Sequence, residues 1–296
     1  MPQAMVILNP SSGKEEALNH LQRVEELLQE QGYEVSVKET AKELDATHFC
    51  IDACRNKYDL VVTIGGDGTL HETINGFTDQ NHRPKLGIVP LGTVNDYARA
   101  LNIPLDALEA IETLRSKRVK AVDMGRVNGE RFANVVAAGS LAESLSAVTS
   151  EDKSRLGAFA YLKEGIKDLM NHSTHPLIIR HDGGTWEGDS PLLLVTLTNS
   201  VGGFEKLAPD AEVDDGLLHC FVIRDLSIFH TVTAGLSLLL GHLKNHKDVD
   251  YFISRKVTVN SPDPVKTNVD GEEGPMLPLE LGILPRYLQV IIPEEG

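Results

Sequence analysis

The segment Leu60–Glu72 constrains the fold of this chain more than any other stretch of its 296 residues. It reads LVVTIGGDGTLHE: a run of apolar residues, then three glycines around one aspartate, then helix-forming residues. This order predicts a buried strand that passes through a glycine turn into a helix, and such a turn presents backbone N–H groups to an anion such as phosphate. The alternative is a tight turn whose glycines only supply positive φ angles.

The glycine loop matches neither of the two common phosphate-binding motifs. A Walker A loop has the pattern G-x-x-x-x-G-K-[ST], which occurs nowhere in the chain, and a dinucleotide-binding loop has glycine where this chain has His71. The loop also contains an acid, Asp67. Because a carboxylate repels phosphate, we expect a divalent cation between Asp67 and the phosphate groups.

Charge and composition exclude several classes of protein. The net charge of −15 argues against a nucleic-acid partner and against tight, nonspecific adhesion to anionic membranes. The N-terminus shows no signal-peptide pattern, so we expect a cytoplasmic protein. The most apolar stretch, Ser227–Leu243, is interrupted by His and Gly and is shorter than the roughly 20 residues of a membrane span. We therefore predict no membrane span, and an amphipathic or buried helix at this stretch.

Cysteine usage fits reduced thiols. The three cysteines, Cys50, Cys54 and Cys220, form no C-x-x-C pair and no zinc-binding pattern. We interpret all three as small buried apolar side chains.

Predicted strands and helices alternate in the first part of the chain. The strands are expected at Met5–Leu8, Glu34–Lys38, Leu60–Ile64 and Lys85–Val89, and the helices from Ser11 or Ser12 to Gly32, at Leu44–Lys57, after Gly68, at Thr93–Leu101 and from Pro104 to Leu114. The first helix has apolar residues at helical spacing: Leu18, Leu21, Val24, Leu27 and Leu28. Such alternation predicts a doubly wound parallel sheet of the α/β class.

The pattern changes to predominantly β structure after about Lys120. Strands are expected at Val122–Val127, Arg131–Ala137, Leu177–Arg180, Thr185–Glu187, Leu192–Leu197, Leu217–Ile223, Ile253–Val259, Val265–Val269 and Tyr287–Ile292. Asn128-Gly129 and Gly183-Gly184 are typical of two-residue hairpin turns. Helices are expected at Ser154–Met170 and Ser227–Lys244. The second half is therefore predicted to be a mostly antiparallel β domain, a sandwich or barrel.

Polar loops follow three of the predicted parallel strands: Asn9–Lys14, Gly65–Thr69 and Pro90–Asp96. Alone, the first fits an ordinary capped turn equally well, and the third is unremarkable. Ligands of such sheets bind beyond the carboxyl ends of the strands, where all three loops fall. Together they favour a shared ligand crevice.

Acidic loops occur in the β-rich half, at Ala208–Asp210, Asp214–Gly216 and Asn268–Glu273. Paired acids and glycines are most often turn residues, which is the simpler interpretation of each loop. A Mg²⁺ site is the alternative if the fold brings these loops opposite Asp67, because Mg²⁺ is usually held by one or two carboxylates plus water and phosphate oxygens.

Five segments together resemble the soluble bacterial diacylglycerol kinase family, within the wider group of sphingosine, ceramide and NAD kinases. They are NPSSGK, GGDGTLHETING, PLGTVNDYARAL, LTNSVGGFEKLAPDAEVDDG and NVDGEE, in the family's order and spacing. GGDGT alone is shared with phosphofructokinases, whereas the combination is highly specific. The resemblance implies an ATP-binding α/β domain at residues 1–122, completed by a strand at 286–294. It also implies a lipid-substrate β-sandwich at 123–285, with the active site in the cleft between the domains.

The resemblance also implies roles for individual residues. The ATP site would comprise Asn9, Pro10, Ser11, Ser12, Gly13, Thr40, Gly66, Asp67, Gly68, Thr69, Leu70, His71, Glu72, Thr93 and Asn95. Asp67 would act through Mg²⁺ on the triphosphate. Asp215 would hold a second, structural Mg²⁺ with backbone carbonyls near Glu212 and Leu217. Glu272 would be the general base, with Asp270 close to it.

These features lead to the hypothesis of a lipid kinase that uses ATP and Mg²⁺ to phosphorylate 1,2-diacylglycerol. The alternatives are a kinase of another alcohol, such as a sphingoid base, undecaprenol or NAD, and a nucleotide or lipid sensor without turnover. The lipid would be met by transient peripheral contact with the membrane. A basic face at Lys153, Arg155, Lys163 and Lys167, with Lys14, would dock there, or would simply be a solvated helix face. The oligomeric state stays open, with a homodimer as one option.

Overall fold

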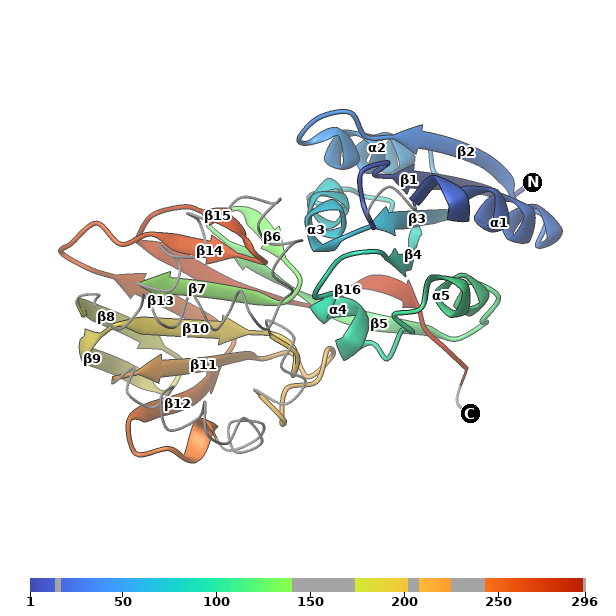
Figure 1. Ribbon diagram of the computed structural model, residues 1–296. Helices are drawn as coiled ribbons and strands as arrows, with labels where there is room; N and C mark the ends of the chain where they lie inside the picture. The colour runs from blue at the N-terminus through green and yellow to red at the C-terminus, as the bar shows by residue number, and fades with distance from the viewer. Residues whose placement is uncertain (14–16, 140–173, 202–207, 225–242, 295–296) are drawn as a thin grey trace. The chain divides into compact units, whose positions relative to one another are not determined.

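The computed structural model describes residues 1–13, 17–139, 174–201, 208–224 and 243–294 of the chain (Figure 1). The chain divides into two units, one of residues 1–122 and 286–296 and the other of residues 123–285. Two strands, β5 (Val119–Val127) and β16 (Leu279–Ile291), run across the unit boundaries. The first unit therefore combines the N-terminal part of the chain with its C-terminal strand.

A parallel sheet forms the centre of the first unit. Its order is β2-β1-β3-β4, and the C-terminal part of β16 lies parallel to β4. The strands are β1 (Gln3–Leu8), β2 (Glu34–Glu39), β3 (Leu60–Gly65) and β4 (Lys85–Pro90). The helices are α1 (Ala17–Glu30), α2 (Asp45–Arg55), α3 (Asp67–Gly76), α4 (Asp96–Ala100) and α5 (Ala107–Thr113). Since β1, β3 and β4 are almost wholly buried, as in sheets covered on both faces, the predicted α/β class is confirmed.

Helix α1 ends near Gly32, as predicted, but the face that it buries is slightly rotated from the predicted apolar face. Gly32 has a φ of +86° and donates to the Gln29 carbonyl at 2.9 Å. The side chain of Leu18, predicted on the apolar face, is 48% exposed, and Ala17 is buried instead. Successive residues are about 100° apart around an α-helix, so the two side chains cannot share the centre of one face.

Helices α2 and α3 approach each other closely at Gly76. A Cβ atom at Gly76 would lie 2.5 Å from the Cys50 Cβ and 2.7 Å from the Thr47 carbonyl oxygen. The same contact is closed at its other end by Glu72, whose carboxylate accepts the Ala46 N–H at 3.2 Å. Glycine is therefore required for the packing that fixes the direction of α3.

The second unit contains a six-stranded sheet of order β12-β11-β10-β7-β14-β15. Its strands are β7 (Val135–Gly139), β10 (Leu192–Thr196), β11 (Leu218–Ile223), β12 (Val249–Ser254), β14 (Thr267–Val269) and β15 (Glu272–Gly274), all paired antiparallel. A second layer is built from β6 (Glu130–Phe132), β8 (His175–His181), β9 (Gly184–Ser190) and β13 (Lys256–Asn260), with parts of β5 and β16. One short 3₁₀ turn, η1 (Leu243–Asn245), precedes β12.

The core of the second unit lies between these two layers. Val136, Val195 and Cys220 from the six-stranded sheet belong to one buried cluster with Ile179 and Val257 from the other layer. Each strand contributes alternate residues, as expected for two packed sheets. The predicted β-sandwich is thus confirmed. All three cysteines are free and buried, as predicted.

Two segments predicted as single strands are divided in the structure. Arg131–Ala137 separates into β6 and β7, because the backbone N–H groups at residues 133–135 are donated to the Asp270 carboxylate instead of a neighbouring strand. Ile253–Val259 separates into β12 and β13 at Arg255, whose N–H is donated to Asp182 at 2.7 Å. Side chain–backbone hydrogen bonds thus redirect the chain from one layer to the other.

Two predicted boundaries also move. Helix α4 begins at Asp96 rather than Thr93, because Asn95 has a left-handed backbone conformation (φ +54°, ψ +43°) that no helix continues through. In the second hairpin His181 pairs with Gly184, so the turn comprises Asp182 and Gly183 rather than the two glycines.

Several predictions fall on parts of the chain outside the described residues. They are the helices at Ser154–Met170 and, for nearly all of its length, at Ser227–Lys244, and the basic residues Lys14, Lys153, Arg155, Lys163 and Lys167. Within the described ranges, no helix has both the length and the apolar character that crossing a membrane requires.

Thr63 on β3 gives a test of the first unit's core. Its side chain is 1% exposed, and its hydroxyl has no hydrogen-bond partner within the described ranges. A buried, unpaired hydroxyl costs roughly 1–3 kcal/mol. We therefore expect Thr63→Val to raise the free energy of unfolding by about 1 kcal/mol in urea titrations.

The matched control is Thr196→Val in the second unit. The Thr196 hydroxyl is also buried, but it contacts the carbonyls of Asn134 and Thr198 at 3.1 and 2.8 Å. Here the same substitution should destabilise. Equal effects at both positions would contradict the assignment of Thr63.

Candidate functional site

The first two polar loops of the parallel sheet are joined by Asn9. Its backbone N–H is donated to the Ile64 carbonyl at 3.1 Å, and its Nδ2 lies 3.2 Å from the Thr69 hydroxyl. Its Oδ1 accepts both the backbone N–H and the hydroxyl of Ser11, at 3.1 and 2.8 Å. The end of β1 is therefore fixed against the start of α3.

The third loop lies against the glycine loop, backbone on backbone. A Cβ atom at Gly92 would lie 2.9 Å from the Gly66 Cα, and the Leu91 N–H is donated to the Gly65 carbonyl at 2.8 Å. Asn95 closes the contact, since its N–H is donated to the Asp67 Oδ2 at 2.9 Å. Any side chain in place of either glycine would push the loops apart.

The start of α3 is a helix N-terminus of the type that can hold an anion. Gly66 is the N-cap residue and supplies no side-chain cap, and Asp67 is in the first turn. The first N–H groups of any α-helix have no partner within the helix, and the helix dipole makes this end positive. A phosphate group can therefore be held by backbone donors, with Asp67 available to share a cation with it.

The other predicted ATP-site residues lie in the loops after β1, β2 and β4 and in the first turn of α3. Ser12 bonds back to Asn9, and a Cβ atom at Gly13 would lie 3.3 Å from the Leu91 side chain. Thr40, at the end of β2, donates its N–H to Leu8, and Thr93 is exposed on the third loop. Pro10 lies in the same turn as Ser12, and Gly68 follows Asp67 in the first turn of α3.

Leu70, His71 and Glu72 lie further along α3 than the glycine loop. The Leu70 N–H is already bonded to Gly66, and its side chain is buried. His71 bonds to Asn75, and Glu72 is turned toward the start of α2. Their place in the ATP site stays a prediction.

In the second unit, a tight hairpin carries the predicted base. Asp270 and Gly271, with φ of +51° and +96°, join β14 to β15, and Glu272 is the first residue of β15. The Asp270 carboxylate accepts the N–H groups of three consecutive residues, Ala133, Asn134 and Val135, at 2.7, 2.9 and 2.9 Å. Glu272 is exposed, and no residue within the described ranges hydrogen-bonds to its carboxylate.

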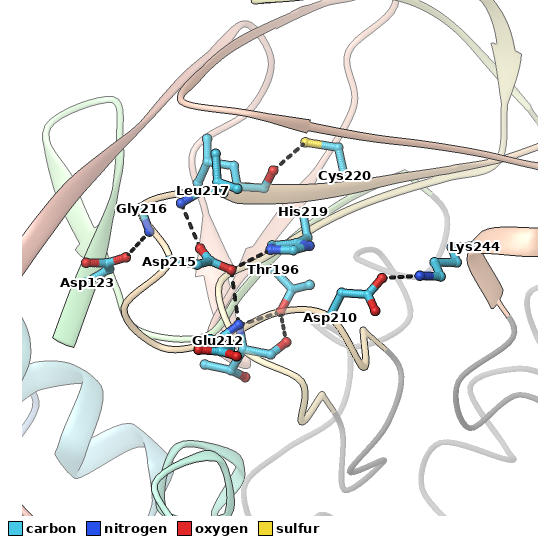
Figure 2. A network of polar contacts seen from close by, with 12 residues as sticks. Asp123, Thr196, Asp210, Glu212, Asp215, Gly216, Leu217, His219, Cys220 and Lys244 are labelled. Carbon is cyan, nitrogen blue, oxygen red and sulfur yellow. Dashed lines mark hydrogen bonds and ion pairs between the residues drawn. The ribbon is translucent and has the colours of Figure 1, made fainter. Parts of the chain in front are cut away.

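Asp215 is surrounded by N–H donors (Figure 2). Its Oδ1 accepts the Leu217 N–H at 2.8 Å, and its Oδ2 accepts the Glu212 N–H at 3.1 Å. The His219 Nε2 lies 2.9 Å from the same Oδ2, and the His219 Nδ1 lies 2.8 Å from the Tyr251 hydroxyl. Asp215, His219 and Tyr251 thus form a continuous, partly buried chain of hydrogen bonds.

The oxygen atoms of this loop are of the type that binds Mg²⁺. A carboxylate and backbone carbonyls are hard oxygen ligands, as Mg²⁺ requires. Three N–H donors already engage the Asp215 carboxylate, so a cation would share it with them. Within the described ranges no group of three or more His, Cys, Asp or Glu side chains is placed to hold a metal, so the site would depend on backbone oxygens.

The surroundings of Asp215 and Tyr251 shift the pKa values of both groups. Burial alone would raise the pKa of Asp215, but the bonds from His219 and the backbone outweigh it and lower the pKa. Burial, together with the charges of Asp210 and Asp215, raises the pKa of Tyr251 to about 12. A residue outside the loop also holds it in place, because the Gly216 N–H is donated to the Asp123 Oδ2 at 2.6 Å.

His219, Tyr251 and Asp123 were not predicted from the sequence. The one available signal is alternation along Leu218–Ile223, which places His219 on the opposite face from Cys220. No sequence pattern indicates that Tyr251 lies beside it, because β12 pairs with β11 across a separation of about 30 residues.

Tyr251 should make stability depend on pH in the alkaline range. Its folded-state pKa of about 12 exceeds the ordinary 10.0, so its stabilising contribution is complete below pH 10 and lost as the pH rises through 12. We expect Tyr251→Phe to be less stable than the wild type at neutral pH, with a difference that shrinks between pH 10 and 12. Urea unfolding at a series of pH values measures this. A difference independent of pH would contradict it.

Comparison with known proteins places the chain among kinases. Residues 3–127 match the family described as the diacylglycerol kinase catalytic domain. Residues 134–292 match the family described as the YegS C-terminal NAD kinase beta sandwich-like domain. The two matches together cover the parallel-sheet half and the sandwich half.

Similar proteins extend the match to the full length. The diacylglycerol kinase of Bacillus subtilis (strain 168) is 38% identical over 296 residues, covering 100% of this chain and 98% of that protein. That of Staphylococcus haemolyticus (strain JCSC1435) is 38% identical over 295 residues, covering 99% and 88%. The crystal structure of a diacylglycerol kinase from Bacillus anthracis strain Sterne has a TM-score of 0.83 at 26% identity, covering 98% and 96%. The chain therefore belongs to the diacylglycerol kinase family of lipid kinases.

Proposed function

We propose that this enzyme transfers the γ-phosphoryl group of ATP to the primary hydroxyl of 1,2-diacylglycerol, giving phosphatidic acid and ADP. The observation that carries this proposal is the contact of the two glycine loops at Gly66 and Gly92, beside the start of α3. It is supported by full-length relatives that are named diacylglycerol kinases.

The triphosphate is proposed to bind where α3 begins. Backbone N–H groups at Gly66–Thr69 would hold phosphate oxygens, and the turn at Asn9–Gly13 would line the same site with Thr40, Thr93 and Asn95. The further family positions, Leu70, His71 and Glu72, would support this turn through the helix. Mg²⁺, held by Asp67, would neutralise charge on the phosphates during transfer.

The acceptor hydroxyl is proposed to be activated by Glu272. In the reaction the hydroxyl oxygen forms a bond to the γ-phosphorus, and the bond from that phosphorus to the bridging oxygen of ADP breaks. The hydroxyl proton passes to the Glu272 carboxylate. An exposed carboxylate on a rigid hairpin is suited to this, because it can accept a proton without losing bonds that hold the fold.

We expect Glu272→Gln to abolish most of the activity and leave the fold intact. The amide cannot accept the proton, so kcat should fall by roughly 10²- to 10⁴-fold. Transfer of labelled γ-phosphate to diacylglycerol in mixed micelles measures kcat, and thermal unfolding measures stability. Near-normal turnover in Glu272→Gln would remove the residue from this role.

Two neighbouring variants serve as controls. Glu273→Gln changes an equally exposed acid one residue along β15 and should retain activity. Asp270→Asn should instead lower stability by about 1–3 kcal/mol, because one of its backbone N–H contacts is then opposed by an amide N–H. Asp270 is thus proposed to hold the hairpin that carries the base.

We expect Asp67→Asn to lose activity by weakening the use of Mg²⁺. The amide oxygen still accepts the Asn95 N–H, so the loops should stay in contact while the negative charge is lost. Activity titrated against Mg²⁺ should show a higher half-saturating concentration than the wild type.

The matched control is Asp106→Asn at the start of α5. Its carboxylate also lies at a helix N-terminus in the same unit, where it accepts the N–H groups of Leu108 and Glu109. An unchanged Mg²⁺ titration is expected for this variant. The same shift in both variants would show that Asp67 acts only through the helix.

The identity of the acceptor is decided in the same assay. Sphingosine, undecaprenol and NAD are offered beside diacylglycerol. Label in one of these would keep the proposed chemistry and change the acceptor. Bound ATP without transfer to any acceptor would favour a sensor. Transient contact with the membrane from the cytoplasmic side stays a prediction, because the basic residues predicted to make this contact lie outside the described ranges.

A further inference from the structure

His219 on β11 is hydrogen-bonded at both of its ring nitrogens. The residue is 3% exposed, its Nε2 lies 2.9 Å from the Asp215 Oδ2 (Figure 2), and its Nδ1 lies 2.8 Å from the Tyr251 hydroxyl. An ionised carboxylate can only accept, so the Nε2 of His219 donates, and in the neutral ring the Nδ1 accepts from the Tyr251 hydroxyl. The two bonds fix both the tautomer and the orientation of the imidazole.

Tyr251 is held beside this ring by the pairing of two strands. It lies opposite Phe221 where β12 pairs with β11. His219 precedes Phe221 by two residues on β11, so its side chain is on the same face of the sheet. The Phe221 and Tyr251 ring centroids are 4.9 Å apart, a favourable distance for two aromatic rings. An aromatic contact therefore supports the residue whose hydroxyl orients the imidazole.

The three N–H donors around Asp215 are divided unequally between its two carboxylate oxygens. A carboxylate has about four positions at which it can accept, and each oxygen carries half of them. The Oδ2 accepts the Glu212 N–H at 3.1 Å as well as the His219 Nε2–H, so both of its positions are taken. Within the described ranges the Oδ1 accepts only the Leu217 N–H, at 2.8 Å. One accepting position remains, and it is on Oδ1.

This remaining position limits how a cation can bind. Ca²⁺ adopts flexible geometries and is often held by both oxygens of one carboxylate, whereas Mg²⁺ demands near-ideal octahedral geometry. The two oxygens of a carboxylate are too close together to fill two positions at right angles, so Mg²⁺ takes one of them. With its Oδ2 already occupied, Asp215 can offer a single oxygen. Loss of the His219 donor would free a position on Oδ2 and allow both oxygens to bind.

We propose that His219, oriented by Tyr251, restricts Asp215 to one oxygen for a cation and thereby selects Mg²⁺ over Ca²⁺. His219 is then a specificity-determining residue that acts through Asp215 and does not touch the cation. This inference rests on the second, structural Mg²⁺ that the family resemblance implies at Asp215, and it does not depend on the Mg²⁺ proposed at Asp67.

The test measures binding of each cation alone to the full chain, after treatment with a chelator and without nucleotide. Isothermal titration calorimetry gives the Kd for MgCl₂ and for CaCl₂ with wild type, His219→Phe and His219→Gln. Wild type should bind Mg²⁺ more tightly. In His219→Phe the ratio of the two Kd values should move toward Ca²⁺ by about tenfold, the lower end of what a group that holds a metal ligand contributes. His219→Gln again offers an N–H to Asp215 and should restore the wild-type ratio.

Two further variants serve as controls. Asp215→Asn removes the charged ligand and reports any cation binding to the rest of the acidic chain. Tyr251→Phe should move the ratio in the same direction as His219→Phe but by a smaller factor, because the imidazole keeps its bond to Asp215 and loses only its orientation. Urea unfolding of each variant shows that the titrated protein is folded.

Three results would overturn the inference. Equal weakening of both cations in His219→Phe, with the wild-type ratio kept, would show that His219 only supports the fold. A ratio that stays shifted in His219→Gln would show that the N–H donor does not decide the selectivity. Identical titrations of wild type and Asp215→Asn would overturn the cation site and the inference with it. Phosphoryl transfer by wild type tests the proposed function separately, because that chemistry is assigned to the Mg²⁺ at Asp67.

Discussion

The organisation of the second unit depends on the hydrogen bonds that the Asp270 carboxylate accepts from Ala133, Asn134 and Val135. These N–H groups would otherwise pair with a neighbouring strand. Because they are taken by a side chain, the chain leaves one layer of the sandwich after β6 and enters the other at β7. Bonds to a charged acceptor are worth more than neutral ones, roughly 1.5–3 kcal/mol each. The same carboxylate fixes the hairpin that presents Glu272, so the fold and the proposed base share one interaction.

The first unit positions its loops in a different way. There the loops are positioned by the absence of side chains, at Gly66 and Gly92, and by backbone bonds such as that from Leu91 to Gly65. A site for a large anion needs backbone N–H groups at close approach, and bulky residues would separate the loops that carry them. Asn9 then ties two of the loops together through its side-chain amide, and Asn95 ties the third to Asp67 through its backbone N–H.

Much of the fold was predictable because its signals are local. Apolar runs ending in glycine or polar turns gave the strands β1, β3 and β4, and Gly32 gave the end of α1. The two strands that are divided in the structure have one cause in common. The breaks at residues 133–134 and at Arg255 depend on acids more than 70 residues away along the chain, and no window of sequence contains both partners.

The same limit applies to the site. The glycine loops could be found because each is contiguous in sequence, and the resemblance supplied roles for Asp215 and Glu272. The bond chain through His219 to Tyr251 joins residues that only the pairing of β11 with β12 brings together. The buried Asn268 Nδ2, which has no hydrogen-bond partner within the described ranges, is a property of packing and has no signature in the sequence.

The acids of the second unit differ in how fully the backbone engages them, and this difference separates their roles. Protonating Asp270 would disturb the bonds to three consecutive N–H groups, and protonating Asp215 would disturb those to Glu212, Leu217 and His219. Both carboxylates are therefore suited to organising loops. Glu272 is exposed and carries none of these bonds within the described ranges. In a motif that places Asp270 and Glu272 two residues apart, the hydrogen bonds give the first acid a structural role, and the proposed role of base falls to the second.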